Sequence, residues 1–153
     1  MSTVTLPEHS EVIELMNGLF GLDIQAAAHT DADVHVIAEY VDDSGTPVAW
    51  IGCDLAGACR MGAALTQVPA GRVDEAVSDG QIPESLAENL DEIFNISVNL
   101  IAAGSGHTVF LRSVTRGADA EFDATCEAMK GCSGLDIDFD IARYGVCRLV
   151  IAR

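Results

Sequence analysis

Cations are scarce in this chain. Lysine occurs once, at Lys130, and arginine seven times, against 24 aspartate and glutamate residues, so the formal net charge over 153 residues is −16. Proteins that bind the phosphate backbone of nucleic acids, or the surface of anionic lipid, need clustered cations. The composition therefore excludes nucleic acid as the partner and disfavours electrostatic docking on a membrane.

Long apolar runs, export signals and metal-binding cysteine patterns are absent as well. The longest mostly apolar stretch, 96–103, is far shorter than the roughly 20 residues of a membrane span, and it contains Asn99. The first residues show no basic region followed by an apolar one, so we expect a cytoplasmic protein. Five cysteines without a CxxC pair, and four histidines without HxH or HxxxH spacing, predict reduced and mostly buried thiols instead of structural zinc.

Apolar residues are plentiful enough for one core. They make up 49% of the chain, and the length is close to the roughly 150 residues of an average domain. No proline-rich linker or low-complexity tract divides the sequence. We therefore expect a single domain over residues 1–153.

The order of patterned segments predicts an α+β fold. Amphipathic or capped segments predict helices, and runs rich in valine, isoleucine and aromatic residues predict strands. The expected helices are 10–21, 70–78, 83–102 and 121–129; the expected strands are 22–28, 34–41, 47–54, 107–115, 135–142 and 146–152. Segment 56–65 is ambiguous and is interpreted as a further strand. This order favours a mostly antiparallel sheet with helices packed on one face.

Alternating aspartates mark one late strand. Asp136, Asp138 and Asp140 are spaced two apart, which is the period of one face of a strand. They lack the turn spacing and the glycine of a calcium loop. We expect an acidic outer face on this strand and no metal site of the chain's own.

The longest predicted helix carries an unusual polar stripe. Glu88, Glu92, Asn95 and Asn99 fall within an arc of about 60°, opposite a wide apolar face. Asparagine inside a helix costs several tenths of a kcal/mol relative to alanine. Three of the four asparagines of the chain nevertheless lie in this helix, Asn89 included. Such a concentration indicates a use for the carboxamides beyond helix formation.

The pattern Glu-x-x-Asn occurs twice, as Glu14/Asn17 and as Glu92/Asn95. With ten glutamates and four asparagines in the chain, chance alone would produce only about a quarter of one such pair. A carboxamide can orient a water molecule through its donor and its acceptor, and a carboxylate can bind a cation of a partner. Neither group is a nucleophile, and no histidine, serine or cysteine is spaced to form a triad. The pattern favours positioning of water onto a group that is already reactive.

The segment Asn-Leu-Asp-Glu-Ile-Phe-Asn-Ile at 89–96 resembles the motif helix of the bacterial chemotaxis phosphatases CheC and CheX. The resemblance implies a CheC/CheX-like fold, shared with the flagellar switch proteins FliM and FliY, and hydrolysis of the aspartyl phosphate of a CheY-type response regulator. Carried over, Asn95 would aim the attacking water and Glu92 would contact a basic residue of the regulator. The chain would need no cofactor of its own, because the magnesium ion would belong to the phosphorylated regulator.

Further residues are expected to support this site. Glu88, Ile96 and Asn99 lie along the same face and are candidate contacts for the partner. Glu14 and Asn17 form a second candidate motif, for which an ordinary solvated helix face is the favoured interpretation.

A non-catalytic role stays open beside the phosphatase interpretation. Glu88 stands where the family pattern has aspartate or serine, and the proline that the family places after the next strand is absent from 113–116. These departures favour an adaptor or dimerisation module of the same fold, which would bind a signalling or flagellar-switch partner. Homodimerisation through a free sheet edge fits either interpretation.

Overall fold

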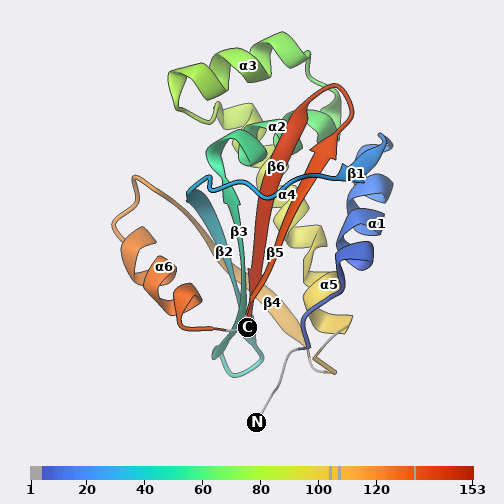
Figure 1. Ribbon diagram of the computed structural model, residues 1–153. Helices are drawn as coiled ribbons and strands as arrows, with labels where there is room; N and C mark the ends of the chain where they lie inside the picture. The colour runs from blue at the N-terminus through green and yellow to red at the C-terminus, as the bar shows by residue number, and fades with distance from the viewer. Residues whose placement is uncertain (1–4, 104, 107, 133) are drawn as a thin grey trace.

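The computed structural model describes residues 5–103, 105–106, 108–132 and 134–153. Its centre is a six-stranded sheet in the order β1-β5-β6-β3-β2-β4, and all neighbouring strands are antiparallel (Figure 1). The strands are β1 Ile24–Ala26, β2 Val34–Asp42, β3 Pro47–Asp54, β4 Val109–Arg116, β5 Gly134–Ile141 and β6 Gly145–Ala152. The helices are α1 His9–Phe20, α2 Leu55–Thr66, α3 Ala70–Asp79, α4 Glu84–Ile96, α5 Val98–Ala103 and α6 Phe122–Lys130. The prediction of an α+β fold with a mostly antiparallel sheet is confirmed.

The turn chemistry that the sequence contains closes the β2–β3 hairpin. Asp42 Oδ1 accepts hydrogen bonds from the backbone N–H groups of Ser44 and Thr46, each at 3.0 Å. Gly45 has a φ of +82°, a left-handed conformation that glycine adopts without steric cost. The register then places Tyr40 opposite Ala49 across the hairpin.

The two faces of the sheet are covered differently. Ala38 and Tyr40 of β2 point into the large core that α1 to α5 cover, whereas Ile37 and Trp50 join a small cluster with Met129 of α6. Successive residues of a strand point to opposite faces, so α6 lies on the face away from the other helices (Figure 1). Five of the six described helices thus share one face, as predicted, and α6 covers part of the other.

Segment 56–65 is helix α2, and its prediction as a strand is wrong. Asp54 caps the helix, because its Oδ1 accepts a hydrogen bond from the Gly57 N–H at 3.0 Å. α2 is packed between the sheet and α4 and is enclosed along most of its length, so its apolar residues lack the one-sided period by which helices are recognised. Its buried residues are mostly small: Gly57, Ala58, Cys59, Met61, Gly62, Ala63 and Ala64.

The single helix predicted over 83–102 is two helices, α4 and α5, which meet at Ser97. The first strand is shorter than predicted, three residues instead of seven. Gly104 and His107, which the sequence places at the end of this helix and at the start of the next strand, lie outside the described residues. Among the helices described, none is long and apolar enough to cross a membrane.

Candidate functional site

The polar stripe predicted from the sequence lies on the exposed side of α4 and α5. Glu88, Glu92 and Asn95 are exposed on α4, Asn99 is exposed on α5, and Ile96 is half-buried at the end of α4. Residues three apart on a helix are neighbours on its surface, so the carboxylate of Glu92 and the carboxamide of Asn95 project side by side. The residues that the sequence predicted for this stripe thus lie on two consecutive helices, with Glu88, Glu92, Asn95 and Ile96 on α4 and Asn99 on α5.

Among the described residues, Glu92 and Asn95 have side chains that make no polar contact with the chain itself. Within the described ranges, neither side chain has a hydrogen-bond or ion-pair partner in the chain itself. Asn89 is different, because its Nδ2 donates to the Gly62 carbonyl and to Thr66 Oγ1, each at 2.9 Å. The unfavourable helix propensity of Asn89 is thereby offset inside the molecule, whereas that of Asn95 is not.

A close approach between α2 and α4 sets the position of the motif helix. A Cβ atom on Gly62 would lie 2.5 Å from the Leu86 carbonyl oxygen, a distance that real Cβ atoms do not reach. Only glycine therefore lets the α4 backbone lie this close to α2. Leu90, Ile93 and Phe94 are at most 1% exposed on the inner side of α4. The helix that carries Glu92 and Asn95 is thus held along its whole inner face.

Tyr40 holds the end of α4 next to Asn95. Its fully buried hydroxyl donates a 2.7 Å hydrogen bond to the Phe94 carbonyl, the peptide group that precedes Asn95. The carbonyl of the preceding residue, Ile93, accepts a hydrogen bond from Ser97 Oγ at 2.7 Å. The Ser97 N–H also donates to the Ile93 carbonyl at 2.9 Å, so the regular i to i−4 ladder is intact at Ile93. The next carbonyl, of Phe94, accepts from Tyr40 at the point where α4 ends.

An arginine that the sequence analysis did not consider lies beside the motif. Arg116 Nη2, at the end of β4, is 3.9 Å from Asp91 Oδ1, on the residue before Glu92. Its Nε is buried and has no hydrogen-bond partner in the described part of the chain. This contact links α4 to the edge strand β4. Only the fold brings residues 91 and 116 together, so no local sequence signal could have identified the pair.

The second motif has a different environment. The Asn17 Oδ1 atom accepts a hydrogen bond from the Ile24 N–H at 3.1 Å, and the Asn17 carbonyl accepts one from Gly21 N at 3.0 Å. The carboxamide oxygen of Asn17 therefore joins α1 to β1. Glu14 is exposed on α1, and no interaction of its side chain is found among the described residues. A catalytic use of this pair stays a prediction.

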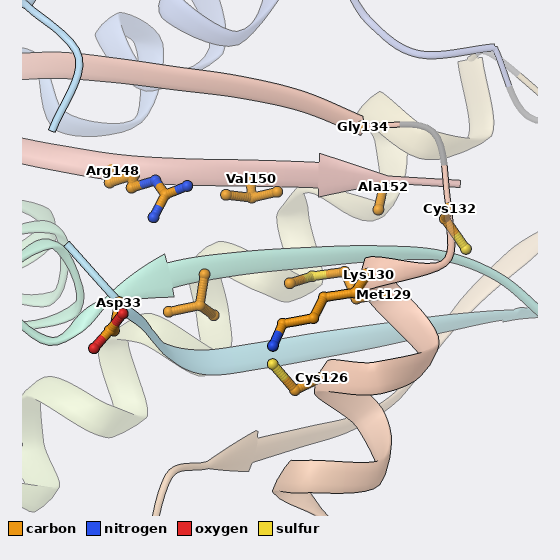
Figure 2. A pocket seen from close by; sticks show the side chains of 10 residues that line it. Asp33, Cys126, Met129, Lys130, Cys132, Gly134, Arg148, Val150 and Ala152 are labelled. Carbon is orange, nitrogen blue, oxygen red and sulfur yellow. The ribbon is translucent and has the colours of Figure 1, made fainter. Parts of the chain in front are cut away.

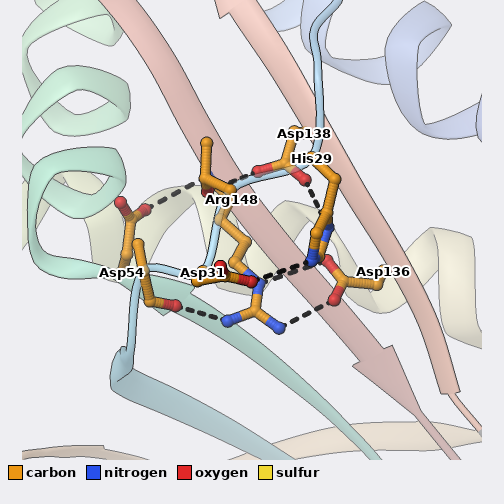
Figure 3. Close-up of polar contacts among 8 residues, drawn as sticks. His29, Asp31, Asp54, Asp136, Asp138 and Arg148 are labelled. Carbon is orange, nitrogen blue, oxygen red and sulfur yellow. Dashed lines mark hydrogen bonds and ion pairs between the residues drawn. The ribbon is translucent and has the colours of Figure 1, made fainter.

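A second polar cluster lies on the opposite face of the sheet (Figure 3). His29 Nδ1 is 3.3 Å from Asp138 Oδ2, and His29 Nε2 is 3.5 Å from Asp31 Oδ1. Arg148 donates to both oxygens of Asp136, at 3.2 Å and 2.7 Å. His29, Asp136 and Asp138 place one possible ligand atom each within 4.8 Å of one another, so these residues could hold a metal ion.

The contacts within this cluster point to a structural role. Thr30 Oγ1 donates to Asp138 Oδ1 at 2.9 Å, and Arg148 Nη1 donates to the Ala32 carbonyl. A guanidinium already neutralises Asp136 and would repel a divalent cation at short range. Together the bonds fasten residues 29–32 across the strands. The prediction that Asp138 lies on an exposed outer face is wrong, because the crossing segment leaves its side chain only 3% exposed.

A cavity of about 540 Å³ lies on the same face, between α6 and the sheet (Figure 2). Lys130 and Arg148 are the cations in its lining. Both have carboxylate partners, since Lys130 Nζ is 3.9 Å from Glu127 and Arg148 is bonded to Asp136. Within the described residues the cavity therefore offers no unpaired cation to a ligand, and the Asp33 carboxylate is the remaining charged group in its lining.

The buried thiols are unsuited to nucleophilic chemistry. Burial raises the pKa of Cys53 and of Cys147 well above the usual thiol range, and the Asp54 carboxylate raises both further. Burial also raises the pKa of Cys59 to about 11. At neutral pH these groups are protonated, and the thiolate is the reactive form. The exposed stripe on α4 is therefore the strongest candidate site.

Comparison with known proteins identifies the fold. No family model and no curated protein matches the sequence. A chain from the crystal structure of the CheX–CheY–BeF3–Mg complex of Borrelia burgdorferi is 14% identical, with a TM-score of 0.51 over 95% of this chain and 97% of that one. A chain from the FliM–SpeE complex of H. pylori is 9% identical, with a TM-score of 0.56 over 94% of this chain and 77% of that one. At such identities the likeness concerns the fold, and activity must be argued from the site.

Proposed function

We propose that this chain, whose fold is that of CheX and FliM, is a phosphatase that hydrolyses the aspartyl phosphate of a CheY-type receiver domain. One observation carries the proposal: Glu92 and Asn95 project together from a helix held firmly on its inner side, and within the described residues both lack an internal partner. Catalysis by positioning needs such a pre-organised pair. The complex that contains CheX, CheY, BeF3 and Mg supports a receiver as the partner.

In the proposed reaction Asn95 positions the attacking water. Its carboxamide oxygen accepts a hydrogen bond from the water and its N–H donates to the water or to the phosphoryl group. The water oxygen forms a bond to phosphorus while the bond between phosphorus and the aspartyl oxygen breaks. The receiver aspartate leaves with the electron pair as a carboxylate, and the water proton passes to the departing inorganic phosphate. An acyl phosphate has a good leaving group, so no enzyme nucleophile is needed.

Glu92 is proposed to bind a basic residue of the receiver. A carboxylate exposed beside Asn95 can form an ion pair with a lysine or arginine and so orient the phosphoryl group toward the carboxamide. The receiver would carry the Mg²⁺ that neutralises the phosphoryl oxygens. Glu88, Ile96 and Asn99 would contact the receiver along the same side of α4 and α5.

The test is the decay of a phosphorylated receiver with and without the protein. The wild-type chain is expected to accelerate decay, and Asn95→Ala to remove most of the acceleration, on the order of a hundredfold or about 2.7 kcal/mol in activation free energy. Glu92→Ala is expected to act mainly on KM, because it removes an ion pair that also forms in the ground state.

Asn99→Ala separates binding from chemistry, since it removes the same kind of exposed side chain from a proposed receiver contact outside the Glu-x-x-Asn pair, and any effect of it belongs in KM. It should leave kcat within about twofold of wild type, a difference of roughly 0.4 kcal/mol. Full activity in the double variant Glu92→Ala/Asn95→Ala would contradict the assignment of the site.

The non-catalytic adaptor is the second candidate, and the TM-score of 0.56 with the FliM chain supports it. On this alternative the same face binds a receiver or a flagellar-switch partner without chemistry. Unchanged receiver decay together with measurable receiver binding would favour the adaptor.

A further inference from the structure

An apolar groove with an acidic rim runs between α1 and α5. Its volume is about 400 Å³, and it is lined by Glu11, Glu14, Leu15, Gly18, Leu19 and Leu100. A second hollow of about 320 Å³ adjoins it, shares Glu11 and Leu100, and extends to Thr5, Leu6, Pro7 and Ala103. Figure 1 shows α5 below α1 in the same helical layer.

Gly18 keeps this groove open. A Cβ atom built on Gly18 meets nothing within 4 Å, so none of the described residues fills the space above it. Glycine in a helix interior costs roughly 0.5–1 kcal/mol relative to alanine, and the backbone of α1 at this position does not require it. The free space at Gly18 is therefore available to a side chain from another molecule.

The charge of the rim restricts what can occupy the groove. Glu11 and Glu14 are exposed, and no lysine or arginine lines either hollow. A second copy of this chain, at net charge −16, would bring its own glutamates against these in a symmetric contact. The complementary partner is a segment with an apolar side chain flanked by lysine or arginine.

The groove adjoins the proposed catalytic stripe. Leu100, in its floor, directly follows Asn99, the last residue of the stripe. A receiver that presents its phosphoryl group to Asn95 would therefore extend over α5 toward α1. This adjacency favours the receiver as the occupant of the groove.

We propose that the groove between α1 and α5 is a docking site for a basic segment of the receiver domain, which carries an apolar side chain into the space above Gly18. This proposal rests on the proposed function, because it takes the receiver as partner. It gives Glu14 a role in docking that does not require Asn17. The site supplies affinity and leaves the chemical step to Asn95.

Two variants test the groove without disturbing the fold. Gly18→Gln places a good helix former where the chain leaves open space, and its side chain obstructs the groove. Glu11→Gln/Glu14→Gln removes the rim charge. The Glu8 N–H donates to Glu11 Oε1 at 3.0 Å, and the side-chain oxygen of a glutamine at position 11 can accept the same hydrogen bond. The thermal midpoint should stay at or above that of wild type for Gly18→Gln and fall by a few degrees at most for the rim variant, which loses the acidic side chain in the first turn of α1.

Matched controls make the same exchanges elsewhere. Gly71→Gln acts on α3, where a Cβ also meets nothing within 4 Å. Asp43→Asn/Asp74→Asn removes two exposed charges outside the groove. Neither control should alter receiver binding by more than about twofold at physiological ionic strength, because none of these residues lines the groove and exposed charges beyond a contact are largely screened.

Affinity for a receiver activated with BeF3 and Mg²⁺ is measured by titration, and phosphoryl decay is measured in parallel. At low salt we expect each groove variant to bind the receiver about tenfold more weakly. KM for the phosphorylated receiver should rise by about the same factor, and kcat should be unchanged. Added salt should weaken wild-type binding more than binding by the rim variant.

The two readouts separate the proposals. If the wild-type chain accelerates decay but the groove variants bind like wild type, the docking site is wrong and the phosphatase stands. If the variants weaken binding but the wild-type chain does not accelerate decay, docking stands and catalysis is wrong. A homodimer that Gly18→Gln dissociates, or the absence of any receiver binding, would overturn the docking proposal.

Discussion

The hydrogen bond from Tyr40 to Phe94 leads to a sharp prediction about catalysis, which the change Tyr40→Phe tests. The substitution removes one oxygen atom from a fully buried side chain and leaves the Phe94 carbonyl without the 2.7 Å bond that it now accepts. Burial raises the pKa of Tyr40 far above that of a free tyrosine, so the hydroxyl keeps its proton at every working pH. The donor is therefore present under all assay conditions.

The expected stability cost follows from the loss of one buried hydrogen bond. Leaving a buried carbonyl unsatisfied costs roughly 1–3 kcal/mol, so the free energy of unfolding should fall by that amount. The carbonyl belongs to the peptide group that joins residue 94 to Asn95. Because a catalytic group must be held within about 0.5 Å and 10–20° of its productive geometry, we expect kcat for receiver dephosphorylation to fall about tenfold, or about 1.4 kcal/mol.

Tyr144→Phe is a matched control, because the Tyr144 hydroxyl donates to the Val68 carbonyl at the same distance, 2.7 Å, away from α4. Urea unfolding should show a loss of stability in both variants, smaller in Tyr144→Phe because that bond is only part-buried, and single-turnover decay of the phosphorylated receiver should slow only in Tyr40→Phe. Receiver affinity should be unchanged in both. Equal rates in the two variants, at a temperature where both are folded, would refute the argument that Tyr40 positions Asn95.

Three further predictions concern packing, the second motif and pH. Gly62→Ala should destabilise the protein by about 2 kcal/mol or more, because the new Cβ would lie 2.5 Å from the Leu86 carbonyl oxygen. Gly71→Ala, where a Cβ meets nothing within 4 Å, should stabilise it by about 0.5–1 kcal/mol, and thermal unfolding compares the two variants. Asn17→Asp keeps the acceptor for the Ile24 N–H, so both stability and receiver dephosphorylation should be retained, and lost activity would show instead that the second motif is catalytic. The contribution of the buried thiols to stability should be complete below about pH 8.5 and be lost above it, because unfolded thiols then lose protons that the buried thiols retain. Each thiol lowers the free energy of unfolding by about 1.4 kcal/mol per pH unit between its unfolded and its folded pKa. Urea midpoints at pH 8 and pH 10 measure this loss, which cysteine-to-alanine variants should reduce; the groups are Cys53, Cys59 and Cys147.

Much of the fold follows from local pattern. The β2–β3 hairpin was predictable because Asp42 and Gly45 have side-chain and backbone properties that favour one turn. The exposed face of α4 was predictable because its apolar residues recur at the helical period and leave Glu92 and Asn95 on the other side. In both places the residues that decide the structure are neighbours in sequence.

Interpretation of α2 as a strand failed for a physical reason. The helix is enclosed by the sheet on one side and by α4 on another, so its composition reflects close packing and carries little amphipathic period. The signal that would have identified it is Asp54 three residues before Gly57, a cap followed by small residues. Asp138 was misplaced for a related reason, because the segment that buries it comes from residues 29–32.

The sequence by itself determined which helix carries the candidate site, since the spacing of Glu92 and Asn95 and their place opposite the apolar face are local properties. Only the tertiary structure decided what each asparagine does. Asn89 bonds to α2 and Asn17 bonds to β1, whereas Asn95 has no partner among the described residues. A hydrogen bond between distant segments depends on chain topology, which no short pattern contains. The same holds for Tyr40, whose hydroxyl meets α4 across 54 residues of sequence.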